Sequence, residues 1–221
     1  MTAFFGKHPG HGDFIGAGLP DLVERGLSDW LGATLGEVRD ILGESWDQIQ
    51  HSPVALRFWM GAGLGQGQAW RGVLRMSGDK VGRRYPLLVL QATGPDTLPV
   101  VQVRQDFYQE AETALADLLD QAVLIPGEVQ ATLDRQLARH APQAAAMSDH
   151  MFWAVKQSPD IEQLCNEVAL TDLISAASGR SYWWFARPNL SGILGGHGLP
   201  DAQALAWLVG GGRQDGADAE S

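Results

Sequence analysis

The chain has 221 residues, a formal net charge of −10 at pH 7 and one cysteine. The negative charge argues against general binding to nucleic acids or acidic membranes, because both require a basic surface. One cysteine excludes an intramolecular disulfide and a zinc site built from several cysteines. The sequence shows no apolar run of membrane-spanning length and no signal-peptide pattern, so we expect a cytoplasmic protein without direct membrane insertion.

The first fifty residues predict a strand, a glycine-rich loop and a long helix. Residues 3–5 are typical of a short strand, and glycines dominate the loop that follows. From Leu19 to Leu42 apolar residues recur at spacings of three and four, which indicates one face of an amphipathic helix. Gly43 ends this helix, and a short helix is predicted at residues 44–50.

Three strands are predicted in the next part of the chain, at residues 54–60, 68–79 and 85–93. The last of them, "YPLLVLQAT", is an almost continuous apolar run. Such a run is typical of a strand that is buried on both faces, as in a sheet covered by helices.

The remainder of the chain alternates between helices and strands. Apolar periodicity and breaks at proline and glycine define the boundaries. The predicted elements are helices at 104–123 and 128–139, a strand at 150–156, a helix capped by Ser158, a strand at 180–187 and a helix that begins at "GLPD", residues 198–201.

This order of elements predicts an α/β fold, a layered αβα sandwich around a mixed β-sheet. No change in composition marks a linker, so we expect a single domain over residues 1–209. Residues 210–221 are rich in glycine and acidic residues, which predicts a disordered tail.

The opening loop, "GKHPGHGDF" at residues 6–14, is the first candidate for chemistry. Its glycines match neither the Walker pattern nor G-x-G-x-x-G in frame, and a tight turn is the simpler interpretation. His8, His11 and Asp13 could hold a metal or act as acid and base, with a further ligand from His150 or His197. The alternative function is therefore a metal- or phosphate-dependent hydrolase that uses these three residues and a turn containing Arg83.

Basic and aromatic side chains suggest a binding surface instead. Five of the 16 basic residues lie within 14 positions, at Arg71, Arg75, Lys80, Arg83 and Arg84. Concentrated positive charge is suited to an acidic or phosphorylated partner, although an ordinary solvated hairpin would have the same composition. Among the eight tryptophans, Trp183 and Trp184 are adjacent on a predicted strand and face opposite sides of the sheet; both could be core, or one could be exposed to a partner.

Two stretches, together with Trp30 in the first long predicted helix, resemble a known family. "FFGKHPGHGDFIGAGLP" at residues 4–20 is similar to the opening of TagF-type proteins (the ImpM family), accessory proteins of bacterial type VI secretion. "SPVALRFWMGAGLGQGQAWRGVLRMSGDKVGRRYPLLV" at residues 52–89 is similar to the central block of that family. The family usually has an arginine immediately before Gly-Asp-Phe, where this chain has His11.

The resemblance implies a regulator and not an enzyme. TagF-type proteins act as posttranslational repressors of type VI secretion, in a pathway with threonine phosphorylation and a forkhead-associated scaffold protein. The resemblance implies that scaffold as the partner, no cofactor, no small-molecule substrate and an α/β sandwich fold. It supplies no catalytic residues.

We therefore predict a partner-binding role for nine residues. We also expect Asp13 and Arg83 to form an ion pair that joins the opening loop to the second glycine-flanked turn. The nine predicted partner-binding residues are Lys7, His11, Asp13, Arg71, Arg75, Lys80, Arg83, Arg84 and Trp184.

Overall fold

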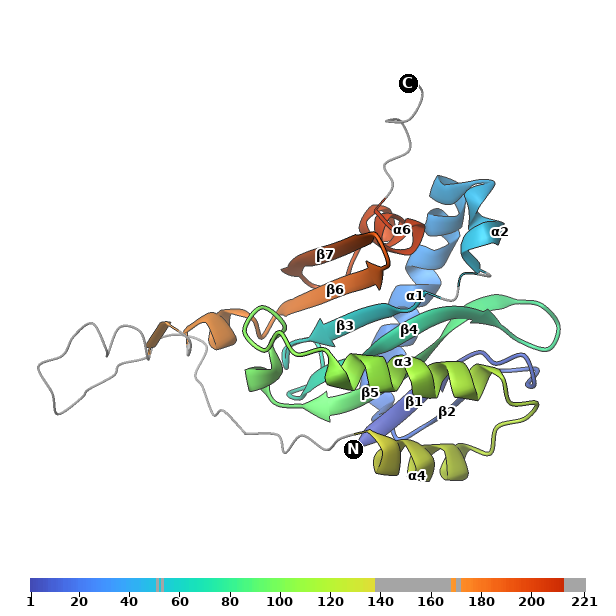
Figure 1. Ribbon diagram of the computed structural model, residues 1–221, viewed down its shortest axis with the longest axis horizontal. Coiled ribbons are helices and arrows are strands. Elements are labelled where there is room, and N and C mark those ends of the chain that lie inside the picture. The colour runs from blue at the N-terminus through green and yellow to red at the C-terminus, as the bar shows by residue number, and fades with distance from the viewer. Residues whose placement is uncertain (51, 53, 138–167, 170–171, 213–221) are drawn as a thin grey trace, which may run out of the picture.

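The computed structural model describes residues 1–50, 52, 54–137, 168–169 and 172–212 (Figure 1). The strand expected at 150–156, most of the helix expected after Ser158, Cys165 and most of the expected tail lie outside the described residues.

A seven-stranded sheet forms the centre of the fold, in the order β2-β1-β5-β4-β3-β6-β7 (Figure 1). Strands from residues near both ends of the described chain therefore belong to one sheet. The strands are β1 (Thr2–Gly6), β2 (Ile15–Ala17), β3 (Leu56–Met60), β4 (Ala69–Gly78), β5 (Arg84–Thr93), β6 (Arg180–Arg187) and β7 (Leu190–His197).

The layered α/β class is confirmed, but the sheet is antiparallel and not mixed. All six pairings between neighbouring strands are antiparallel. The apolar run of β5 indicated burial on both faces, which is correct, since Leu87 to Leu90 are fully buried. Burial on both faces does not determine strand direction, however, and the short hairpin between β4 and β5 makes that pair antiparallel.

Helices cover both faces of the sheet (Figure 1). One face packs against α1 and α6, and the other against α3 and α4, so the core is divided into two apolar layers. The helices are α1 (Asp21–Leu42), α2 (Ser45–Gln50), α3 (Asp106–Leu119), α4 (Pro126–Gln136) and α6 (Ala202–Gly210), with a 3₁₀ turn at Pro95–Thr97.

The side-chain alternation of the strands assigns residues to these two layers. Trp183 is fully buried on the α1 side and stacks on Phe58, with ring centroids 4.9 Å apart. Trp184 faces the α3 side, where its ring meets Tyr108 edge-on at 4.7 Å. The two adjacent tryptophans therefore face opposite sides, as predicted, and both are buried.

Two strands were not predicted from the sequence, β2 and β7. β7 contains three glycines, and its apolar alternation is correspondingly weak. At Gly195 an added Cβ would lie 2.7 Å from the ring of Tyr182, the residue opposite it on β6. This position of β7 therefore requires a glycine.

Candidate functional site

The opening loop begins at a glycine that the sheet requires. Gly6, the last residue of β1, has φ +140°, and a Cβ there would lie 2.1 Å from the carbonyl oxygen of Pro86. Only glycine allows β1 to approach β5 this closely. The chain then leaves the sheet as a loop over residues 7–14 and returns through β2.

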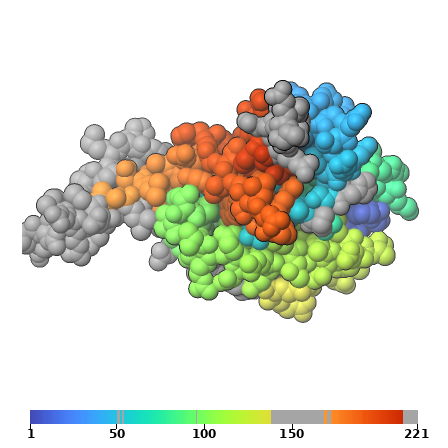
Figure 2. All heavy atoms as spheres, turned by 45° about the horizontal axis from the view of Figure 1, so that its top comes forward, coloured from blue at the N-terminus to red at the C-terminus, as the bar shows by residue number. Residues whose placement is uncertain are grey.

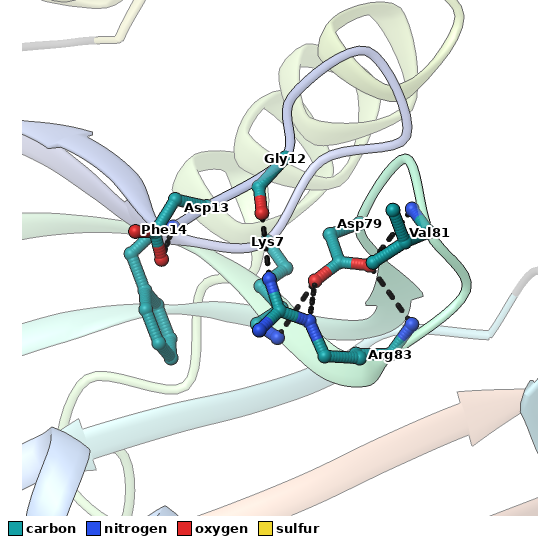
Figure 3. Close-up of polar contacts among 7 residues, drawn as sticks. All are labelled: Lys7, Gly12, Asp13, Phe14, Asp79, Val81 and Arg83. Atoms are coloured by element: carbon teal, nitrogen blue, oxygen red, sulfur yellow. Dashed lines mark hydrogen bonds and ion pairs between the residues drawn. The ribbon is translucent and has the colours of Figure 1, made fainter.

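Asp79, in the turn between β4 and β5, joins this loop to the turn (Figure 3). Its carboxylate is inaccessible to solvent and accepts hydrogen bonds from Lys7 Nζ at 2.9 Å and from Arg83 Nε at 2.6 Å. It also accepts the backbone N–H groups of Val81 at 3.1 Å and of Arg83 at 2.9 Å. Burial alone would raise the pKa of Asp79, but these four donors outweigh it and hold the pKa well below its usual range.

Two further hydrogen bonds hold the loop against the turn. Arg83 Nη2 donates to the carbonyl oxygen of Gly12 at 2.6 Å (Figure 3), and the backbone N–H of Lys80 donates to the carbonyl oxygen of His11 at 2.8 Å. Loop and turn therefore form one rigid unit, although they lie about seventy residues apart in the sequence.

The expected ion pair between Asp13 and Arg83 is wrong. Asp13 Oδ1 accepts the backbone N–H of Phe14 at 2.8 Å, and no ion pair joins Asp13 to Arg83 in the described part of the chain. Asp79 lies in the same turn as Arg83 and is already positioned by backbone hydrogen bonds, so it takes the guanidinium instead. Arg83 does connect loop and turn, as predicted, but through Asp79 and the Gly12 carbonyl group.

The two histidines of the loop use their ring nitrogens to bind the backbone. His8 is fully buried; its Nδ1 accepts from Gly10 N at 3.0 Å, so Nε2 carries the proton and donates to the carbonyl oxygen of Leu118 at 2.9 Å. His11 Nε2 accepts the backbone N–H of Leu124 at 2.9 Å. The two rings thus attach the loop to the C-terminal end of α3 and to the connection between α3 and α4.

Burial lowers the pKa of His8; the hydrogen bond to Leu118 opposes this shift and nearby His11 adds to it. An arginine at position 11 could not accept the Leu124 hydrogen bond, because its guanidinium has no acceptor. The substitution relative to the usual family residue therefore changes how this loop is held.

Apolar and cationic side chains lie together on the outside of the loop and turn. Phe14 is 45% exposed and stacks on Phe5, with ring centroids 5.6 Å apart, while Lys7 Nζ lies 5.2 Å from its ring centroid. Val81 is 71% exposed at the tip of the turn. We call the exposed set the loop–turn surface; it comprises Phe14, Lys80, Val81, Arg83 and Arg84.

Sequence reasoning missed two residues of this site. Asp79 was not a candidate, although the spacing Asp79-x-Val81-x-Arg83 is typical of an aspartate that accepts from its own turn. Val81 was also not a candidate, because an apolar residue in a turn gives no signal until its exposure is known.

The structure places two predicted residues away from the loop–turn surface. Arg71, on β4, is buried beneath α3; it donates to Gln91 Oε1 at 2.8 Å, and its guanidinium carbon lies 3.9 Å from the Phe107 ring centroid. Trp184, on β6, donates to Gln105 Oε1 at 3.0 Å. Their roles in partner binding stay predictions, as does that of Arg75, which is half-buried on the Arg71 face of β4.

The described residues contain no cluster of three histidine, cysteine, aspartate or glutamate side chains with metal-binding geometry. Within the same residues, no helix has both the length and the hydropathy needed to cross a bilayer.

Three comparisons relate the chain to known proteins. The family model described as "TagF N-terminal domain, Type VI secretion system-associated" matches residues 3–136, more than half of the chain. No curated protein matches it. The crystal structure of PA0076 from Pseudomonas aeruginosa PAO1 has the same fold, with a TM-score of 0.75 and 24% identity over 95% of this chain and 94% of that one. The family match covers the opening loop, the turn at Asp79 and helices α1 to α4, and the chain therefore belongs to the TagF family of type VI secretion system-associated proteins.

Proposed function

We propose that this chain is a cytoplasmic regulator of a bacterial type VI secretion system, which represses secretion after translation by binding a forkhead-associated scaffold protein. It acts by binding alone, without a cofactor and without catalytic turnover. The family assignment supports the association with type VI secretion, and the family resemblance is the reason for naming this partner and this effect.

The loop–turn surface is the observation that supports a binding role. Lys80, Arg83 and Arg84 are exposed side by side in a chain of net charge −10. Phe14 and Val81 add exposed apolar area in the same loop and turn, and Asp79 holds the turn through the backbone N–H groups of Val81 and Arg83. A preorganised surface of this kind loses little conformational entropy on binding and is suited to an acidic segment with an apolar anchor.

The test is an affinity pull-down with the tagged full-length chain from the native bacterium. Lys80→Glu/Arg84→Glu reverses two exposed charges that make no side-chain hydrogen bond or ion pair with described residues. Arg25→Glu/Arg39→Glu on α1 makes the same change in net charge on another exposed surface. We expect the wild type and the α1 variant to retain the scaffold, and the turn variant to lose it, while circular dichroism shows all three folded.

Phe14→Ser examines the apolar part of the same surface. It removes a ring that is 45% exposed but also packs on Phe5 and Tyr85. We therefore expect weaker capture of the scaffold together with a moderate loss of stability, and circular dichroism shows whether the variant is folded at the assay temperature. If the scaffold is absent from the wild-type pull-down, or if the turn variant captures it as well as the wild type does, the proposed binding surface is wrong. A secretion assay in the deletion strain, complemented with each variant, then measures repression directly.

A further inference from the structure

Among the described strands, β7 lies at one edge of the sheet. Its inner edge pairs with β6 over eight residues, and no described strand pairs with its outer edge (Figure 1). Every second residue of such a strand presents an N–H and a C=O group outward, and these groups form a template for another strand.

The chemistry of this edge does not prevent strand addition. Protected edges usually contain charged residues or proline, whereas residues 190–197, "LSGILGGH", contain no Lys, Arg, Asp, Glu or Pro. Leu190 is 50% exposed and Ile193 is 56% exposed. A partner strand that is also uncharged and apolar could therefore pair with this edge without removing any charged group from water.

The face of the sheet beside this edge is also apolar and open. Trp184 and Ile193 are opposite each other in the β6–β7 register and point to the α3 side. They line a hollow of about 320 Å³, and Val103, which is 70% exposed, lines its other side. In Figure 2 the orange surface that includes β7 borders the green surface that includes the segment before α3.

The sequence of β7 is complementary to itself. In an antiparallel pair of two β7 strands with Ile193 opposite Ile193, the residue numbers of opposed positions sum to 386. Leu190 then lies opposite Gly196, Ser191 opposite Gly195, and Leu194 opposite Gly192. Each larger side chain faces a glycine of the other copy, the two Ile193 side chains meet at the centre, and no charged residue opposes another.

We propose that two copies of this chain associate through their β7 strands in that register. The two sheets then form one continuous antiparallel sheet, and the interface is isologous, with a twofold axis at Ile193. Residues opposite each other in a sheet point to the same face, so the hollows beside Trp184 lie on one face of the joined sheet. This dimer is independent of the loop–turn surface, which lies at the ends of β1, β4 and β5, where the residue 7–14 loop meets the β4–β5 turn.

Light scattering during size-exclusion chromatography tests the oligomeric state of the full-length chain. The wild type is expected at about twice the monomer mass of 23.8 kDa, with dissociation on dilution. Ile193→Lys places two like charges opposite each other and yields the monomer. Leu22→Lys on α1 is the matched control, because Leu22 is equally exposed at 56%, and it remains dimeric. The high net negative charge opposes association, so raising the salt concentration increases the dimer fraction.

Cysteine cross-linking tests the register, in a Cys165→Ser background. Residues directly opposite in an antiparallel pair have Cα atoms roughly 4.5–5.5 Å apart, which a disulfide can span. Ile193→Cys is therefore expected to form a disulfide-linked dimer under mild oxidation. Leu190→Cys is not, because the two copies of residue 190 lie roughly 20 Å apart at about 3.4 Å per residue.

A wild-type monomer at every concentration tested overturns the proposal. A dimer that survives Ile193→Lys, or that cross-links through Leu190→Cys and not through Ile193→Cys, shows that a different surface is responsible. Neither result bears on the scaffold pull-down, because the variants of the two experiments alter separate surfaces.

Discussion

Lys7 and Asp79 form a buried ion pair of 2.9 Å between the opening loop and the β4–β5 turn. The Lys7 side chain is 8% exposed and the Asp79 carboxylate is fully enclosed. Little solvent reaches either charge, so the Lys7 ammonium depends on Asp79, and the Asp79 carboxylate depends on Lys7 and Arg83. The geometry of the loop–turn surface therefore depends on one carboxylate that itself contacts no solvent.

Replacing this carboxylate will destabilise the protein. Asp79→Asn leaves the Lys7 ammonium buried without a counter-ion, so we expect a clear fall in the midpoint of thermal unfolding. Asp13→Asn, which removes an exposed carboxylate from the neighbouring loop, should leave the midpoint almost unchanged. Equal midpoints for the two variants, measured by scanning calorimetry, would contradict the role assigned to Asp79.

The same variant should change stability in acid. The pKa of Asp79 lies below its usual range in the folded state, so below about pH 4 the unfolded chain takes up a proton that the folded chain does not. Stability from this group is present above about pH 4 and is lost as the pH falls toward the folded pKa. The acid loss of unfolding free energy, followed by urea denaturation, should be shallower in Asp79→Asn than in the wild type.

Gly6 and Gly12 provide a matched test of the loop. Gly6→Ala places a Cβ against the Pro86 carbonyl at a φ of +140°, and we expect a loss of about 2 kcal/mol in unfolding free energy. Gly12→Ala meets no atom within 4 Å and has no positive φ, so its effect should stay within about 0.5 kcal/mol. Urea denaturation measures the unfolding free energy of both variants. A Gly6→Ala variant as stable as the wild type would mean that β1 and β5 can move apart to admit the Cβ without loss of stability.

Arg57 and Glu112 form a further ion pair, which joins β3 to α3. Arg57 donates to both carboxylate oxygens of Glu112 at 2.7 Å, and its side chain is only 9% exposed. Glu112→Ala leaves this buried guanidinium without its carboxylate, although the hydrogen bond to Gln105 remains, and should cost about 3 kcal/mol of unfolding free energy. Glu110→Ala on the exposed side of α3 is the control, and a similar loss there would attribute the effect to helix propensity.

Much of the fold follows from local patterns in the sequence. The spacing of apolar residues located α1, α3 and α4, and the apolar run of residues 85–93 indicated that helices cover both faces of β5. β7 was missed because its glycines are required by the Tyr182 ring on the neighbouring strand, a contact that no local pattern contains. Strand direction was also missed, since burial of both faces occurs in parallel and antiparallel sheets.

The site shows the same division between local and long-range information. The sequence identified the opening loop and the basic turn as one candidate surface. The ion-pair partner that it predicted for Arg83 was Asp13 and not Asp79. Both carboxylates lie in glycine-flanked segments, and only the folded chain shows which of them is close to Arg83. The burial of Arg71 beneath Phe107 likewise depends on α3, which lies more than thirty residues further along the chain.

His8 should make stability depend on pH near neutrality. Burial lowers its pKa in the folded state, whereas in the unfolded chain it titrates near its ordinary value of about 6.5. Below that pH the unfolded chain binds a proton that the folded chain rejects, so the unfolding free energy falls as the pH drops from about 7 toward about 5.5. His8→Gln removes this titration but keeps a donor for the Leu118 carbonyl, and its stability should therefore change less over the same range, from a lower value at pH 7 because Gly10 N loses its acceptor. Urea denaturation at several pH values measures both slopes. A His8→Gln slope equal to that of the wild type would contradict a lowered pKa of His8 in the folded protein.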